Sequence, residues 1–342
     1  MDRLLTVRDV AEYLQMSKEK VYKLAQQGKF LFPELKTNGD LGLKINTWLK
    51  VNELGTISVF TESKPLEIVT KADPFLKWAG GKGQLLKQYE ALFPEKFNNY
   101  FEPFVGGGAV FFYLYNTGNL NNDKKVILLD SNEELINCYL AIKENVNRLI
   151  AVLSGPKFVN KKEIYYKIRA EDPLDKFERA ARTIYLNKTC FNGLYRVNSQ
   201  GKFNVPFGGY RNPLICNTEN LRAVNRVLQN VEILCGGFER SLEFVKRGDF
   251  IYFDPPYQPL SKTSSFTSYT RDSFGEKDQN SLCFVFKELD KIGCTVMLSN
   301  SDTSFIRKLY KDFRIEVVFA KRAINCKASG RGAISELVIL NY

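Results

Sequence analysis

The run YFEPFVGGGAV at residues 100–110 decides the fold class, because it joins an apolar stretch to three glycines and a second apolar stretch. Glycine has no Cβ, so its backbone can turn sharply and approach a ligand closely. The run therefore predicts a strand, a tight turn and the start of a helix. Many α/β proteins place glycine at such a turn for packing alone, so a ligand is not required by this run by itself.

A second strand is predicted over Val126–Leu129, and it ends at Asp130, 22 residues beyond Gly108. In nucleotide-binding sheets, an acid about 20 residues after the glycines hydrogen-bonds ribose hydroxyls. Two roles stay open for Asp130, since it could bind a ribose or cap the helix expected before Glu133. Both roles can coexist if Ser131 takes the cap. The spacing favours a nucleotide-type ligand.

A third strand over Phe250–Phe253 leads into Asp254-Pro255-Pro256-Tyr257. Ligands of open α/β sheets gather at the carboxyl ends of strands. The prolines fix φ, so Asp254 and the Pro255 carbonyl can accept hydrogen bonds from one planar amino group. Such acceptors localise the nitrogen lone pair for attack on an electrophilic methyl group, and Tyr257 offers a surface on which an extruded base can stack. The alternative is a rigid proline turn with an exposed Asp254.

Two other segments are expected near the same edge of the sheet. The segment FLKWAGGK at residues 75–82 combines an indole, a flexible turn and a cation, which suits the carboxylate of an amino-acid moiety. A simple surface turn is the alternative. The segment SNSD at residues 299–302 follows an apolar stretch and is a further strand-end candidate near the catalytic pocket.

The composition excludes several classes of site. Lysine and arginine outnumber aspartate and glutamate by 49 to 38, and the net charge of +11 favours a polyanionic partner such as nucleic acid. The chain has no histidine, which excludes Ser-His-Asp and Cys-His triads and the common zinc sites, so we expect no metal. The seven cysteines form no CxxC pair, and no apolar run approaches a membrane span. A cytoplasmic protein is expected.

The N-terminal residues 1–54 are expected to form a separate DNA-binding domain. Apolar side chains follow helical spacing at Val7, Val10, Ala11 and Leu14. Ser17 is placed to cap a second helix and Gly28 to end it. Residues 4–49 resemble the excisionase and MerR-like helix-turn-helix family, with Trp48 and Leu49 closing a small core. A helical pair that only packs on a neighbour is the alternative.

The next residues, 55–72, suit a linker, and the order of strands and helices after Asp73 predicts an α/β sheet. Residues 73–342 resemble the Dam family of DNA adenine methyltransferases, in which the cofactor motif comes first and DPPY last. The matching motifs are LKWAGGK at 76–82, EPFVGGG at 102–108 and YFDPPY at 252–257. The resemblance implies a Rossmann-like, S-adenosylmethionine-dependent methyltransferase sheet with an inserted target-recognition domain at about 145–225.

The resemblance also implies the activity: transfer of a methyl group to N6 of a flipped-out adenine in double-stranded DNA. The implied S-adenosylmethionine contacts are Trp78, Lys82, Phe104, Gly106, Gly108, Asp130, Phe238 and Asp254. The implied catalytic residues are Asp254, Pro255 and Tyr257. Such an enzyme serves restriction-modification or regulation, and a separately acting cognate restriction endonuclease is compatible with it.

Cations, amides and aromatic residues alternate in the segments 187–198 and 201–208, a mixture typical of DNA contacts. A β-hairpin with lysines that only cover apolar surface is the alternative. The segments resemble the recognition hairpin of Dam enzymes that modify GATC. That resemblance implies DNA contacts for Lys77, Phe191, Asn192, Leu194, Arg196, Asn198 and Pro206. Arg196 would contact guanine, and Phe191 and Asn192 would fill the gap left by the flipped adenine.

Two alternatives remain from the sequence. The catalytic corner suits any planar amino group, so N4 of cytosine or a base in RNA is a possible acceptor. The N-terminal segment also allows a DNA-binding regulator whose methyltransferase domain is secondary or inactive. The recognition segments favour duplex DNA adenine, and an intact Asp254 corner favours an active enzyme.

Overall fold

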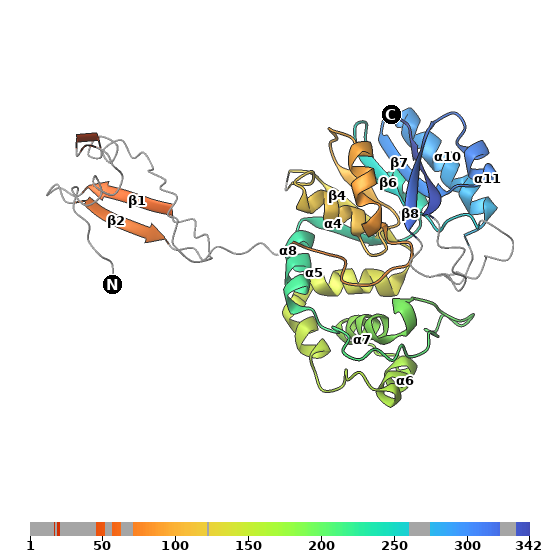
Figure 1. Cartoon of the computed structure of the whole chain (residues 1–342). Coiled ribbons are helices and arrows are strands. Elements are labelled where there is room, and N and C mark those ends of the chain that lie inside the picture. Colours follow the sequence, from red (N-terminus) through yellow and green to blue (C-terminus); the bar gives the residue numbers. More distant parts are fainter. Residues whose placement is uncertain are drawn as a thin grey trace. The chain divides into compact units, whose positions relative to one another are not determined.

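The computed structural model describes residues 17, 19–20, 46–51, 57–62, 71–121, 123–259, 274–321 and 333–342 of the 342-residue chain. The chain divides into two compact units, Met1–Val69 and Thr70–Tyr342. Figure 1 draws both units and labels their main elements.

In the N-terminal unit, β1 (Asn46–Val51) and β2 (Ile57–Glu62) form an antiparallel hairpin. Strand β2 lies inside the range 55–72 that the sequence predicts to be a linker, because pairing with β1 gives its backbone hydrogen-bond partners. Trp48 and Leu49, which were expected beside the helices, lie on β1.

The predicted helix-turn-helix lies outside the described residues, apart from Ser17 and residues 19–20 at the expected start of its second helix. There the backbone N–H of Lys20 lies 3.3 Å from Oγ of Ser17. This is the contact made by a serine that caps a helix. The DNA-binding role of residues 1–54 stays a prediction.

The C-terminal unit is built on a seven-stranded sheet with the order β5-β4-β3-β6-β7-β9-β8. The strands are β3 (Tyr100–Glu102), β4 (Val126–Asp130), β5 (Val231–Cys235), β6 (Phe250–Phe253), β7 (Thr295–Ser301), β8 (Arg314–Lys321) and β9 (Ala333–Leu340). Strands β3 to β7 run parallel, whereas β9 is antiparallel to both of its neighbours. The three strands predicted around the motifs, β3, β4 and β6, lie side by side.

The strand order reverses direction between β3 and β6. Chain order proceeds from β3 to β4 and β5 on one side, and from β6 to β7 on the other. In open α/β sheets the loops at such a switch point diverge and leave a crevice for ligands. The EPFVGGG and DPPY motifs follow β3 and β6, so both motifs lie at this switch point.

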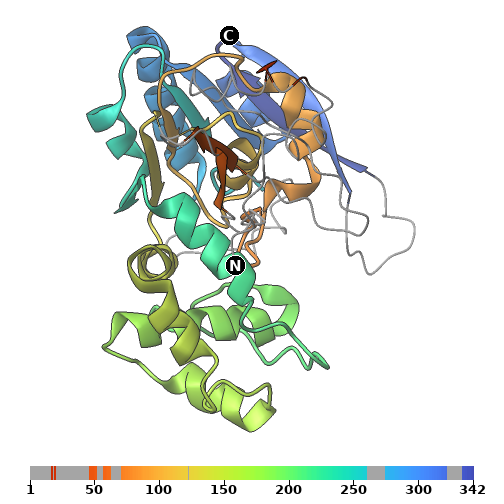
Figure 2. The same cartoon turned by 90° about the vertical axis from the view of Figure 1, so that its left-hand side faces the viewer.

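Helices cover both faces of the sheet (Figure 1, Figure 2). Strand residues alternate between two apolar cores: Tyr100 and Tyr252 belong to one, whereas Phe101 and Ile251 belong to the other. The first core is completed by α4 (Ala109–Asn116), α5 (Glu133–Leu153) and α8 (Thr218–Leu228). The second is completed by α9 (Ser241–Phe244), α10 (Glu276–Ile292) and α11 (Ser304–Leu309). The sheet with helices on both faces confirms the α/β fold predicted from the sequence.

A helical insertion separates β4 from β5. It comprises the distal part of α5, α6 (Lys162–Ala170), α7 (Lys176–Thr189) and the 3-10 turn η3 (Phe191–Gly193). Helix α5 has non-helical dihedral angles at Asn145, close to the expected start of the insertion. The expected hairpin after η3 is held by two isolated antiparallel bridges, Cys190 with Phe207 and Val197 with Phe203. Figure 1 and Figure 2 both draw α6 and α7 below the sheet.

Short elements connect β3 and β5 to their surroundings. Ahead of β3 lie η1 (Lys82–Gln84), α3 (Leu86–Tyr89) and η2 (Glu90–Leu92), and after β5 lies η4 (Phe238–Arg240). On α3, the side-chain amide of Gln88 donates to the carbonyl of Phe319 at 3.0 Å and accepts from its N–H at 3.0 Å. Phe319 belongs to the outer strand β8, so one side chain satisfies both of its backbone groups.

Candidate active site

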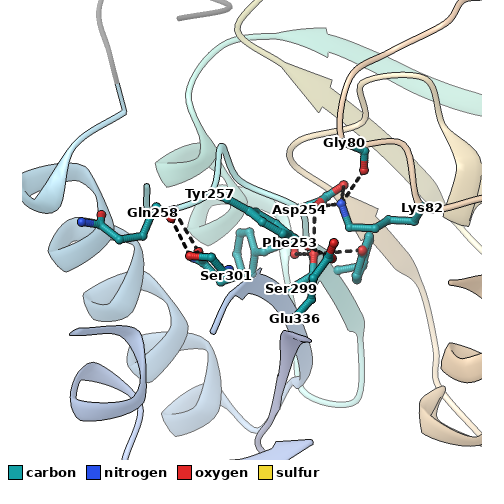
Figure 3. A network of polar contacts seen from close by, with 11 residues as sticks. Gly80, Lys82, Phe253, Asp254, Tyr257, Gln258, Ser299, Ser301 and Glu336 are labelled. Carbon is teal, nitrogen blue, oxygen red and sulfur yellow. Dashed lines mark hydrogen bonds and ion pairs between the residues drawn. The ribbon is translucent and has the colours of Figure 1, made fainter. Parts of the chain in front are cut away.

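The carboxylate of Asp254, which follows β6, is held by a buried cation. Lys82 Nζ lies 2.6 Å from Oδ1 and 2.7 Å from Oδ2 of Asp254, and it also donates to the carbonyl of Gly80 at 2.6 Å (Figure 3). Ser299 Oγ donates to Oδ1 at 2.8 Å. A buried charge is costly unless it is paired and hydrogen-bonded, and these contacts satisfy both conditions. Lys82 was expected to face a ligand carboxylate, and in this structure its carboxylate partner is Asp254.

The end of β7 fixes the loop that follows Asp254. The N–H of Gln258 donates to Asn300 Oδ1 at 3.1 Å, and Ser301 Oγ donates to the carbonyl of Gln258 at 2.6 Å. Gln279 of α10 donates to the carbonyl of Pro256 at 3.0 Å. The strand-end segment 299–302 therefore lies against the DPPY corner, as its position after an apolar stretch predicted. Pro255 is buried in the middle of this fixed turn.

Tyr257 contributes an aromatic surface beside Asp254. Its hydroxyl donates to Oε2 of Glu336 on β9 at 2.7 Å, and Lys82 Nζ lies 4.7 Å from the centre of its ring. Burial, followed by the nearby charge of Asp254, raises the pKa of Tyr257 well above its ordinary value. The hydroxyl therefore stays protonated and donates throughout the neutral pH range.

The glycine turn after β3 lies against the end of β4. Asp130 accepts hydrogen bonds from the N–H of Gly106 at 3.0 Å and from the N–H of Asn132 at 2.9 Å. Asn132 caps α5, since its side chain accepts from the N–H of Leu135 at 3.0 Å. The alternative that Asp130 or Ser131 supplies this cap is wrong, because Asn132 is the residue directly before the helix. Asp130 remains half-buried at the switch point.

Trp78 covers the glycine turn. A Cβ on Gly106, whose φ is +47°, would lie 2.7 Å from Cδ1 of the Trp78 indole, so packing alone already requires glycine there. The indole also stacks on Tyr195 of the insertion, with ring centres 5.2 Å apart. Trp78 therefore joins the glycine turn to the predicted recognition segment.

Two aromatic rings lie at the ends of β3 and β5. Phe104 and Phe238 stack with ring centres 5.5 Å apart and an interplanar angle of 26°. Phe238 is buried, and Phe104 is partly exposed. Asp130 ends β4, which lies between β3 and β5, so the acid and the two rings lie at the same edge of the sheet.

Most of the residues predicted to contact DNA lie in the segment between α7 and α8. Lys77, Phe191, Asn192, Arg196 and Pro206 are exposed, whereas Leu194 and Asn198 are partly buried. Arg196 Nε donates to Asn204 Oδ1 at 2.7 Å. Asn198 Oδ1 accepts from the N–H groups of residues 200 and 202, so this side chain organises the loop itself.

A cavity of about 230 Å³ lies apart from this corner, lined by Lys71, Phe75, Lys188, Leu214 and Asn217 among others. None of the residues predicted to act in catalysis or to bind the cofactor lines it. We assign it no role.

A family model for D12 class N6 adenine-specific DNA methyltransferases matches residues 78–324, which include the glycine turn, the recognition segment and the DPPY corner. The chain belongs to this family. Its sheet is accordingly the Rossmann-like methyltransferase sheet expected from the sequence, and its substrate is DNA. Of the acceptors that the sequence left open, the family description names N6 of adenine.

Similar curated proteins belong to the same class. A type II methyltransferase, M.MjaIII of Methanocaldococcus jannaschii, is 50% identical over 79% of this chain and 99% of its own length. The DNA adenine methylase of Haemophilus influenzae is 36% identical over 79% of this chain and 94% of its own. The DNA N-6-adenine-methyltransferase of Escherichia phage P1 is 33% identical over 98% of this chain and 44% of its own.

Three polar residues beside the candidate site were not predicted from the sequence to have a role there. Glu102, within the EPFVGGG motif, is buried and accepts from the Tyr100 hydroxyl at 2.8 Å. Asn187, the first residue of the segment 187–198, is buried and forms hydrogen bonds with both backbone groups of Lys77. Glu336 follows an uncharged stretch far from any motif, so no local signal pointed to it. Position in the EPFVGGG motif could have indicated Glu102.

Within the described parts of the chain, no helix has both the length and the apolar composition needed to cross a membrane. The same residues contain no group of three or more acidic, cysteine or histidine side chains arranged to hold a metal ion.

Proposed function

We propose that this D12-family enzyme transfers a methyl group from S-adenosylmethionine to N6 of a flipped-out adenine in GATC. The observation that carries the proposal is the Asp254 carboxylate, held by Lys82 and Ser299 beside Tyr257 at the switch point of the sheet. The D12-family match supports adenine as the target. The recognition sequence rests on the resemblance of the segment around Arg196.

The residues at the switch point fit the cofactor chemically. Asp130 would accept hydrogen bonds from ribose hydroxyls, and the Phe104–Phe238 pair would lie against the adenine ring. Trp78, Gly106 and Gly108 would line the rest of the cofactor site. When bound, S-adenosylmethionine supplies a methyl group on a positively charged sulfur.

Asp254 is proposed to prepare the target nitrogen. The N6 lone pair of adenine is delocalised into the ring, so it is a weak nucleophile. Lys82 and Ser299 orient the Asp254 carboxylate, and Oδ2, which accepts from Lys82 but not from Ser299, keeps a lone pair for an N6–H group. Together with the carbonyl of Pro255, Asp254 would hold the two N6 hydrogens and direct the lone pair at the methyl group. Tyr257 would stack on the extruded base.

The recognition segment is proposed to select the site. Arg196 would donate to guanine in the major groove, with Leu194 and Pro206 on the thymine side and Lys77 at the outer guanine. Phe191, which is 51% exposed, and Asn192 would fill the space left by the extruded adenine. Asn198 would hold the loop that presents Arg196.

The biological setting is proposed from the relatives. M.MjaIII is named a type II methyltransferase, which supports a modification role beside a separately acting restriction endonuclease. The Haemophilus influenzae relative is named a DNA adenine methylase, which supports a regulatory role equally well. Residues 1–54 are proposed to add DNA affinity, and the protein is proposed to act in the cytoplasm.

Replacement of Asp254 by Ala tests the mechanism. Incubation with tritiated S-adenosylmethionine and plasmid from a methylation-deficient host should give no transfer, while DNA affinity in fluorescence anisotropy stays within about threefold. Digestion of treated plasmid with methylation-sensitive nucleases should protect GATC for the wild type only. Asp123→Ala, which removes an exposed acid that accepts from Asn121 ahead of β4, is the matched control and should keep activity. Wild-type-like methylation by the Asp254→Ala variant would overturn the assignment.

A further inference from the structure

Glu336 occupies an unexpected position in the sheet. Strand β9 runs antiparallel to β7, and Glu336 is paired in register with Ser301 at the carboxyl end of β7. The first residues of β9 therefore lie at the edge where β3 and β6 also end. Figure 3 draws the Glu336 side chain directed at Tyr257.

The face on which Glu336 lies is otherwise apolar. Side chains two apart on a strand share a face, and the next two on this face, Val338 and Leu340, are fully buried in the core. A carboxylate beside that core loses hydration, and this costs free energy unless a strong hydrogen bond offsets it. The Tyr257 hydroxyl supplies a charge-assisted bond of 2.7 Å. A valine or leucine would pack here without that requirement.

The bond to Glu336 restrains the one part of Tyr257 that the loop does not fix. The backbone around Tyr257 is held through the carbonyl of Pro256 and the N–H of Gln258. These contacts leave rotation of the ring about Cβ–Cγ and Cα–Cβ free. The hydroxyl oxygen lies on the Cβ–Cγ axis at the far end of the ring, so its bond to Glu336 fixes rotation about Cα–Cβ and with it the position of the ring. Lys82 over the ring face restricts the remaining rotation about Cβ–Cγ.

We propose that Glu336 is a positioning residue that fixes the place of the Tyr257 ring for stacking of the target base. The proposal rests on the proposed role of Tyr257 as the stacking surface. Glu336 does not touch the base. It determines through Tyr257 how often an extruded base lies in the orientation in which Asp254 can engage N6.

The test compares Glu336→Ala, Glu336→Gln and Tyr257→Phe in the full chain. A Gln side chain keeps an oxygen that accepts from Tyr257, whereas the other two variants remove the bond from either side. We expect Glu336→Ala and Tyr257→Phe each to lower kcat about tenfold with KM for DNA within twofold, because the base still binds but is misoriented. Glu336→Gln should recover most of the loss. The double variant Glu336→Ala/Tyr257→Phe should be no slower than either single one.

A spectroscopic measurement separates positioning from general damage. A duplex with 2-aminopurine at the mapped target adenine reports stacking of the extruded base, and its fluorescence should be higher in complex with Glu336→Ala than with Glu336→Gln. Glu316→Ala on β8, which removes a strand glutamate paired with Arg314, is the matched control and should resemble the wild type. Thermal unfolding of each variant gives its folded fraction.

The proposal is overturned if Glu336→Gln is as slow as Glu336→Ala, if the two single losses multiply in the double variant, or if kcat falls only in proportion to the folded fraction. The proposed function fails separately, when wild-type protein does not methylate adenine in the plasmid assay. If the wild type instead methylated another amino base, the same variants would still decide the role of Glu336.

Discussion

At the scale of single residues, two acids at the carboxyl ends of β3 and β4 couple the stability of the free protein to pH. Burial raises the pKa of Glu102 to about 8, although the Tyr100 hydroxyl bond lowers it, and burial raises the pKa of Asp130 to about 6. Glu102 is therefore mostly a neutral acid at pH 7 in the folded protein and a carboxylate in the unfolded chain.

The raised pKa of Glu102 predicts that the free energy of unfolding depends on pH, and Glu102→Gln tests this. A folded-state pKa above the unfolded value means that the folded protein holds its proton more tightly. The stabilisation is fully present below pH 4.5, the ordinary pKa, and is lost as pH rises through about 8. We expect the wild-type free energy of unfolding to fall by up to about 1.4 kcal/mol per pH unit from this group within that window. Urea unfolding of cofactor-free protein between pH 6 and 9 measures it.

The Gln variant should remove this slope, because an amide keeps an acceptor for Tyr100 but does not ionise. The raised pKa of Asp130 also makes the free energy of unfolding fall with rising pH, but between pH 3.8 and about 6. It therefore leaves the slope between pH 6 and 9 to Glu102. Equal slopes for wild type and Glu102→Gln between pH 6 and 9 would contradict the role given to Glu102.

The sequence indicated which residues belong to the catalytic corner more readily than it indicated which side chains contact them. Asp254 follows an apolar strand and precedes two prolines, so its position at a strand end was predictable. Its partners Lys82 and Ser299 lie 172 and 45 positions away in the chain, and only the strand order brings them together. Glu336 depends on the antiparallel register of β9, which no local pattern specifies.

At the scale of elements, Asn187 near the end of α7 connects two segments with different predicted tasks. Its amide accepts from the N–H of Lys77 at 2.9 Å, donates to the carbonyl of Lys77 at 2.8 Å and donates to the carbonyl of Gly193 at 3.1 Å. The LKWAGGK segment and the recognition turn are thus held by one buried side chain.

We predict that Asn187→Ala destabilises the protein by about 2–4 kcal/mol, because it leaves buried backbone groups without partners. It should also lower kcat/KM for DNA about tenfold or more beyond any loss of folded protein. Chemical denaturation and steady-state methylation measure the two effects.

Asn225→Ala is the matched control, since Asn225 donates to the carbonyls of Ile142 at 2.7 Å and Lys143 at 3.0 Å away from the site. It should cost stability without a specific loss in kcat/KM for DNA. If both variants behave alike, Asn187 only supports the fold.

Among the elements, the strands around the motifs were predicted because apolar runs and glycine or proline boundaries mark them. Asp130 as a nucleotide-type acid and Asn132 as the helix cap were harder to separate, because all of residues 130–132 are good capping types. Only the observed start of α5 at Glu133 distinguishes them. The hairpin of β1 and β2 escaped prediction because its strands lack a clear period-2 pattern.

At the scale of the whole molecule, the sheet and every described residue of the proposed site belong to Thr70–Tyr342. M.MjaIII aligns over 99% of its length with 79% of this chain, so a relative of this class matches without the remaining fifth. We therefore expect Thr70–Tyr342 to fold and to methylate DNA without the N-terminal unit.

We therefore predict that a chain of residues 70–342 keeps its kcat within about threefold of the full-length value. If residues 1–54 bind phosphates, the shorter chain should also lose DNA affinity, and its affinity should depend less steeply on salt. Methylation assays and anisotropy titrations at several salt concentrations measure both. A truncated chain that folds but does not methylate would show that the N-terminal unit takes part in catalysis.

The side-chain bridge from Gln88 to Phe319 has a consequence for how copies of the enzyme meet. An outer strand with free backbone groups is a template on which another polypeptide can add a strand, and this is a common start of aggregation. Gln88 occupies one N–H and one carbonyl on β8 with an amide that imitates a neighbouring strand. The bridge thereby shortens the edge that is open to intermolecular strand pairing.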